Sequence, residues 1–118
     1  MGVRYADRAR REKRLRQELA DIVARIVDAD TDKVLLFGSL ARGSVRSTSD
    51  VDLLVIRRDA RPPAARADDL YRRAAPRVAL DLLVYTPEEL ERTRADSSFL
   101  RAALRDAEVV YERGRTLA

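Results

Sequence analysis

The sequence contains no cysteine and no histidine. Without cysteine there is no disulfide, thiolate zinc site or cysteine nucleophile, and without histidine the most common general base is missing. No apolar run reaches the roughly 18 residues that a membrane helix needs, and the N-terminus has no secretory signal pattern. We therefore expect a cytoplasmic protein without membrane association, whose chemistry depends on carboxylates, hydroxyls, guanidinium groups or a metal ion bound by oxygen atoms.

The length and composition predict one packed domain over residues 1–118. Hydrophobic residues make up 46% and charged residues 37% of the chain, which favours a core with a strongly charged surface over disorder. The formal net charge is +4, and lysine occurs only at positions 13 and 33. This basic balance suits a nucleotide, a nucleic acid or an acidic protein surface, but a genome-wide bias toward arginine codons explains it equally well.

Apolar residues at three- and four-residue spacing predict a helix over residues 5–28, which the stretch 30–32 ends. The buried stripe of this helix comprises Leu15, Leu19, Ile22, Val23, Ile26 and Val27. The opposite face carries six basic residues, namely Arg8, Arg10, Arg11, Lys13, Arg14 and Arg16. This face is either solvated or contacts phosphate or a partner.

Four apolar segments of the remaining chain predict strands at 34–37, 51–57, 78–85 and 108–112. A short helix is expected at 39–42, and Gly43 can end it in a left-handed conformation. Prolines 62 and 63 precede a helix whose predicted inner face holds Ala67, Leu70, Tyr71 and Ala74. Thr86, Pro87 and Glu89 form a capping box, and a last helix near 98–106 is expected to turn Phe99, Leu100, Ala103 and Leu104 inward.

Two carboxylates lie inside the stretch LFGSLARGSVRSTSDVDLLV, residues 35–54. Asp50 and Asp52 are two residues apart on a predicted strand, so their side chains point to the same face. Left unpaired, they would repel each other and lose solvation, and Mg²⁺ is a cation that binds such oxygen ligands. If the strand that contains Asp81 is a neighbour, three carboxylates converge and can hold two metal ions about 4 Å apart.

The Gly38-Ser39 turn supplies a phosphate-binding element next to these acids. Glycine lets a phosphate approach the backbone, and N–H groups at the start of the following helix, which Ser39 caps, donate toward an anion. Taken separately, Gly38-Ser39 could be an ordinary turn, Asp50 and Asp52 part of a surface loop, and Asp81 a buried acid. Their combination favours a site that binds a metal ion and a phosphate. The predicted nucleotide-binding residues are Gly38, Ser39, Arg42, Arg46 and Ser49.

This combination resembles the signature of the DNA polymerase β-like nucleotidyltransferase superfamily: Gly38-Ser39, ten residues, Asp50-x-Asp52, and later Asp81. Within it, the form GSLARGSVRSTSDVDLLV is most similar to the minimal nucleotidyltransferase (MNT) family, which includes the antitoxins of HEPN/MNT toxin–antitoxin pairs. The resemblance covers a catalytic core over residues 33–113. It implies an α/β (α+β) fold, with a small mixed β-sheet flanked by helices. The residue after Ser39 is often arginine in relatives but is leucine here.

The resemblance also implies a chemistry: two Mg²⁺ ions and ATP, with AMP transferred to a hydroxyl acceptor. In the antitoxins the acceptor is a tyrosine of the HEPN ribonuclease toxin, which the modification silences. By resemblance Gly38 and Ser39 hold the triphosphate, while Asp50, Asp52 and Asp81 are the metal ligands and catalytic residues. Asp81 is either also the general base or a metal ligand alone.

Three functions fit this interpretation. The first is an AMP-transferring antitoxin that forms a hetero-oligomer with a HEPN-family toxin. The second is a nucleotidyltransferase for a small molecule such as an aminoglycoside, or for an RNA end. The third is a non-catalytic antitoxin that occludes its toxin. If the protein is an AMP-transferring antitoxin, we do not expect it to bind nucleic acid directly.

Overall fold

The computed structural model describes residues 2–46 and 50–115, with side chains from residue 6 onward. The elements follow one another as α1 (Gly2–Ile26), β1 (Thr31–Phe37), α2 (Gly38–Arg42), β2 (Val51–Arg57), α3 (Pro63–Ala74), β3 (Leu80–Tyr85), α4 (Pro87–Asp96), α5 (Ser98–Arg105) and β4 (Glu108–Glu112). No helix within these ranges is both long enough and apolar enough to cross a membrane.

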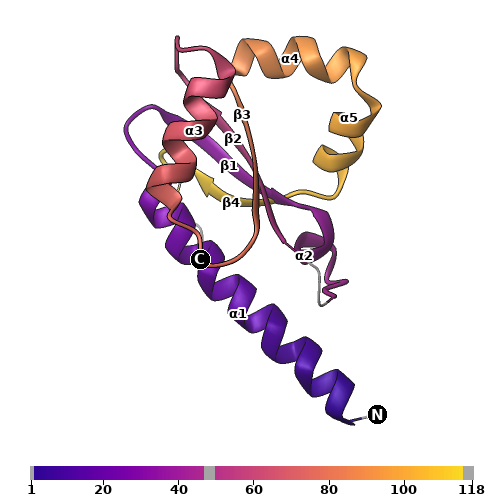
Figure 1. Ribbon diagram of the computed structural model, residues 1–118. Helices are drawn as coiled ribbons and strands as arrows, with labels where there is room; N and C mark the ends of the chain where they lie inside the picture. Colours follow the sequence, from indigo (N-terminus) through magenta and orange to yellow (C-terminus); the bar gives the residue numbers. More distant parts are fainter. Residues whose placement is uncertain (1, 47–49, 116–118) are drawn as a thin grey trace.

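The four strands form one mixed sheet in the order β3-β2-β1-β4. Strand β1 is antiparallel to both β2 and β4, whereas β2 and β3 are parallel. Helix α3 provides the crossover that a parallel pair requires, and α1 and α3 lie on the same side of the sheet (Figure 1). The arrangement confirms the expected α+β fold with a mixed sheet and flanking helices.

Alternating side chains of the central strands fill two separate cores, because successive residues of a strand point to opposite faces. On one face, Val34 and Leu36 of β1 pack with residues of α1 and α3. On the other face, Leu35 of β1 and Leu54 and Ile56 of β2 pack with residues of α4 and α5. The continuous apolar run of β1 is therefore covered on both sides, as predicted.

The connection between α1 and β1 differs from the prediction. The helix ends at Ile26 rather than at residue 28, and Thr31 already belongs to β1. Asp28 starts a polar turn, since its side-chain Oδ1 accepts a hydrogen bond from the Asp30 N–H at 2.9 Å. Thr31 is completely buried, and its Oγ1 accepts from the Asp28 N–H at 3.0 Å. This local satisfaction of backbone donors lets the strand begin three residues earlier than its apolar run.

Two predicted boundaries shift at other places. Strand β3 begins at Leu80 rather than at residue 78, and α5 ends at Arg105, one residue earlier than expected. The predicted strands at 51–57 and 108–112 are confirmed. The terminal residues of a strand or helix form fewer backbone hydrogen bonds than its interior residues. The pattern of apolar residues alone therefore locates the ends of an element poorly.

Two aromatic residues predicted to face inward are exposed. Tyr71 is 47% exposed on α3, and Phe99 is 63% exposed on α5. On α3 the buried polar residue is instead Arg66, whose guanidinium forms two hydrogen bonds to the Glu89 carboxylate at 2.6 and 3.0 Å. The same Glu89 completes the predicted capping box with Thr86 at the start of α4. This ion pair connects α3 to α4 across the end of the sheet.

Candidate active site

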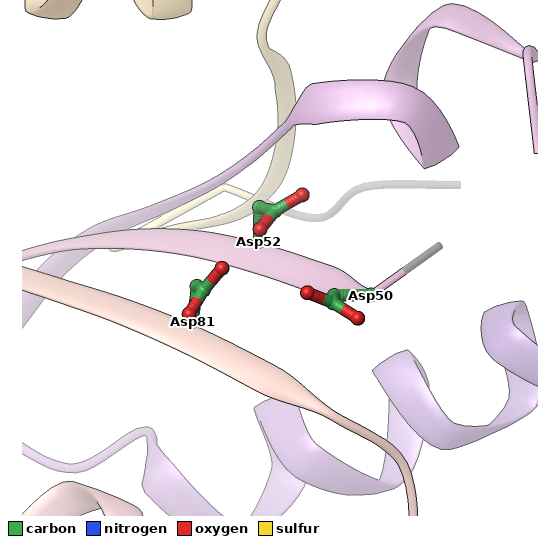
Figure 2. A group of neighbouring side chains, drawn as sticks. All are labelled: Asp50, Asp52 and Asp81. Atoms are coloured by element: carbon green, nitrogen blue, oxygen red, sulfur yellow. The ribbon is translucent and has the colours of Figure 1, made fainter. Parts of the chain in front are cut away.

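The parallel pairing of β2 with β3 brings the three acids together. Asp52, the second residue of β2, is in register with Asp81 of β3, and Asp50 precedes β2 by one residue. One carboxylate oxygen from each of the three residues lies within 4.8 Å of the others. Figure 2 shows the Asp81 side chain directed toward Asp52, with Asp50 just before the start of the strand that carries Asp52. Because β2 and β3 are neighbours, the three carboxylates converge as the sequence predicted.

Within the acidic triad, Asp50, Asp52 and Asp81, the surroundings of Asp52 disfavour a negative charge on its carboxylate. Burial, a hydrogen bond with Asp81 and the charges of Asp81 and Asp50 raise the pKa of Asp52 from its usual 3.8 to about 6. The nearby Arg42 guanidinium acts in the opposite direction without overcoming them. Three carboxylates whose oxygens lie this close together fit a divalent cation such as Mg²⁺.

Gly38 lies against the triad and occupies a position that only glycine fits. Its φ of +77° is left-handed, and a Cβ atom there would lie 2.2 Å from Oδ2 of Asp52. The backbone between β1 and α2 therefore contacts the Asp52 carboxylate directly. This contact fixes the start of α2 beside the acids.

Helix α2 confirms one sequence prediction and corrects another. Gly43 ends the helix in a left-handed conformation with φ 72°, as predicted. Ser39, however, is not the cap: Phe37 occupies that position without a side-chain hydrogen bond, and Ser39 lies in the first turn. Leu40 is completely buried in the core. The side chain at position 40 therefore packs α2 against the sheet.

A polar pocket of about 430 Å³ opens beside the triad. Its lining contains most of the predicted nucleotide-binding and metal-binding residues, namely Gly38, Ser39, Arg42, Arg46, Asp50 and Asp52, together with Ser44. The predicted contact residue Ser49 lies outside the described residues. Backbone N–H groups, hydroxyls and guanidinium groups are the donors that bind phosphate oxygens.

A second pocket, of about 530 Å³, adjoins the first and has different walls. Gly38, Arg42 and Asp52 line both pockets, whereas Asp81 lines only the second. The apolar walls come from Phe37, Leu82, Leu83, Phe99, Ala102 and Ala103. Sequence reasoning missed this pocket because it assigned Phe99 to the core, and helical periodicity does not distinguish a core face from a pocket wall.

The family model described as a nucleotidyltransferase domain matches residues 13–76, which include the Gly38-Ser39 turn, Asp50 and Asp52. The chain belongs to the nucleotidyltransferase domain family. It is thus an enzyme of the nucleotidyltransferase class, as the motif predicts. Asp81 lies beyond the matched residues, and the β2–β3 register places it at the same site. No curated protein sequence matches the chain.

Solved structures of similar fold extend this comparison. A protein of Sulfolobus solfataricus described as a nucleotidyltransferase has a TM-score of 0.68 at 20% identity, over 94% of this chain and 92% of the other. A toxin–antitoxin complex with AMP-PNP has a TM-score of 0.52 at 18% identity, over 83% and 73% of the two chains. A mutant of the MntA–HpeT toxin–antitoxin complex has a TM-score of 0.51 at 17% identity, over 84% and 73%. These likenesses concern the fold.

Proposed function

We propose that this nucleotidyltransferase transfers AMP from ATP to a hydroxyl group of a partner protein, and that it acts as the antitoxin of a HEPN-family ribonuclease toxin by modifying a tyrosine. The observation that carries the proposal is that a polar pocket meets three converging carboxylates at Gly38 and Asp52. Two fold neighbours are toxin–antitoxin complexes, one of them with AMP-PNP, which supports ATP and a toxin partner.

In this proposal the polar pocket holds the triphosphate. Backbone N–H groups at the start of α2 and the Ser39 hydroxyl donate to phosphate oxygens, and Arg42 and Arg46 offset their charge. The triad would hold Mg²⁺, which would neutralise phosphate charge and lower the pKa of the acceptor hydroxyl. Asp50 and Asp52 line the same pocket, so a metal ion that they held would lie beside the phosphates.

We assign the acceptor side of the site to Asp81. It is the exposed member of the triad, whereas Asp50 and Asp52 are half-buried, so a side chain carried on a protein surface can reach it. The acceptor oxygen would bond to the α-phosphorus, the bond from that phosphorus to pyrophosphate would break, and the Asp81 carboxylate would accept the hydroxyl proton. Pyrophosphate would leave through the polar pocket.

The test uses tagged protein incubated with ATP and Mg²⁺ in lysate of the source cells, followed by the intact mass of the protein that co-purifies. We expect wild type to yield a partner heavier by whole adenylyl groups, with the mass added at a tyrosine. Asp52→Asn should bind the same partner without modifying it. Asp68→Asn, an exposed acid on α3 away from the site, is the matched control and should behave as wild type.

Other outcomes would contradict the proposal in distinct ways. A partner that wild type binds but leaves unmodified would favour occlusion. Modification of a small molecule or an RNA end instead of a protein would refute the proposed acceptor. Equal transfer by Asp52→Asn and wild type would refute the assignment of the site.

A further inference from the structure

The apolar pocket touches the triad at Asp52 and Asp81, but most of its wall is apolar. Beyond the shared residues Gly38, Arg42 and Asp52, aromatic and aliphatic side chains line this pocket together with the carboxylates of Asp81 and Asp106, and none of these groups neutralises phosphate charge. Its volume of about 530 Å³ is in the range of small-molecule sites, about 300–1,000 Å³. It is continuous with the polar pocket at Gly38, Arg42 and Asp52. A ligand that spans both pockets must therefore have one anionic part and one largely apolar part.

Phe99 is the residue of this pocket whose position is hardest to explain by packing. Its side chain is 63% exposed, although a buried phenylalanine stabilises a protein by roughly 1.5–3 kcal/mol more than an exposed one. An edge-to-face contact with Phe37, with ring centroids 6.4 Å apart and an interplanar angle of 86°, orients the ring at the pocket. The exposed surface of Phe99 is then available for stacking with a flat ring.

We propose that this pocket binds the nucleoside of the nucleotide substrate, with its base stacked on Phe99; the assignment rests on the proposed use of ATP. A nucleotide has the required division into an anionic polyphosphate and a flat, weakly polar base. Its α-phosphate then lies near Asp52, where the two pockets meet. The acceptor approaches Asp81 from solvent, because this carboxylate is exposed. Phe99 is thus a substrate-binding residue that the motif does not contain.

Calorimetric titration of the purified full-length protein tests the assignment, with ATP and inorganic tripolyphosphate as probes in the presence of Mg²⁺. Tripolyphosphate carries the anionic part of the ligand without the nucleoside. Base stacking on an aromatic side chain changes affinity by about tenfold or more. We expect wild type to bind ATP more tightly than tripolyphosphate, and Phe99→Ala to lose about tenfold for ATP with no change for tripolyphosphate.

Two further variants separate stacking from loss of structure. Phe99→Tyr keeps an aromatic ring and should retain the affinity of wild type for ATP. Tyr71→Ala removes the other exposed aromatic side chain noted above, which lies on α3 away from the pocket, and should also bind ATP normally. Thermal melts of all variants show whether any of them fails to fold.

Each remaining outcome has a separate meaning. If a folded Phe99→Ala binds ATP as tightly as wild type does, the nucleoside pocket is refuted and the phosphate site stands. Equal affinity of wild type for ATP and tripolyphosphate would refute it as well. If wild type binds neither ligand, the proposed function itself fails, and the nucleoside pocket fails with it.

Discussion

Gly38→Ala tests whether the contact between the α2 backbone and the acidic triad is needed for transfer. A Cβ atom at position 38 would lie 2.2 Å from Oδ2, 3.0 Å from Cγ and 3.4 Å from Cβ of Asp52. All three atoms belong to one carboxylate side chain, so the clash is relieved only if Asp52 rotates away or the start of α2 moves. The first change breaks the triad, and the second displaces the phosphate pocket.

The expected magnitudes differ for stability and activity. An L-residue at the left-handed φ of +77° costs about 1–2 kcal/mol of folding stability. Activity should fall much further, because a displacement of about 1 Å at a reacting centre can reduce the rate by about 100-fold. The assay follows transfer of label from ATP labelled at the α-phosphate to the captured partner, beside thermal melts of each variant.

Gly43→Ala is the matched control for this experiment. Gly43 has nearly the same conformation, with φ +72°, but a Cβ atom there would meet nothing within 4 Å. We expect it to lose a similar amount of stability while keeping most of its activity. Wild-type transfer by Gly38→Ala would refute the reasoning, and so would an equal loss of activity in both variants, because the backbone conformation alone would then explain the effect.

Three other predictions follow from the charged groups. The raised pKa of Asp52 makes folding less favourable as pH rises from 3.8 through about 6, because the carboxylate is then charged in both states but less well solvated in the folded one. Asp52→Asn removes this charge and should stabilise the metal-free protein at pH 8 by on the order of 1 kcal/mol, a value reduced for solvent screening. Denaturant melts should show the extra stability of Asp52→Asn disappearing near pH 4. The same extra stability at every pH would contradict a raised pKa for Asp52. Glu89→Gln should cost about 2 kcal/mol, because the buried Arg66 loses its carboxylate partner. The hydrogen bonds from Arg66 lower the pKa of Glu89 from 4.5 to about 2, so the ion pair should stop stabilising wild type as pH falls from 4.5 to about 2. Denaturant melts of Glu89→Gln should lack this pH-dependent loss of stability, and an equal loss in both proteins would refute the prediction. Arg46→Ala should weaken tripolyphosphate binding without changing stability by more than about 0.5 kcal/mol, and unchanged binding in calorimetry would remove Arg46 from the phosphate site.

Much of the fold was predictable where local physics decides it. Apolar periodicity located α1 and its buried face, and the Thr86–Glu89 capping box was recognisable because its hydrogen bonds connect residues three apart. The assignment of Ser39 as a helix cap was wrong: the cap is Phe37, and the sequence does not distinguish a capping serine from one two positions later, in the first turn. Phe99 and Tyr71 were assigned to the core because an apolar helix stripe does not reveal what covers it.

The candidate site divides in the same way between sequence and structure. The sequence by itself determined that Asp50 and Asp52 share a face, because side chains alternate along any strand. It also determined that a glycine turn and a short helix precede them. Only the tertiary structure decided that Asp81 joins them, because a parallel pairing between distant segments depends on the packing of α3 and not on any local preference. The apolar pocket likewise exists only because α5 packs beside the end of β1, which places Phe99 next to Phe37.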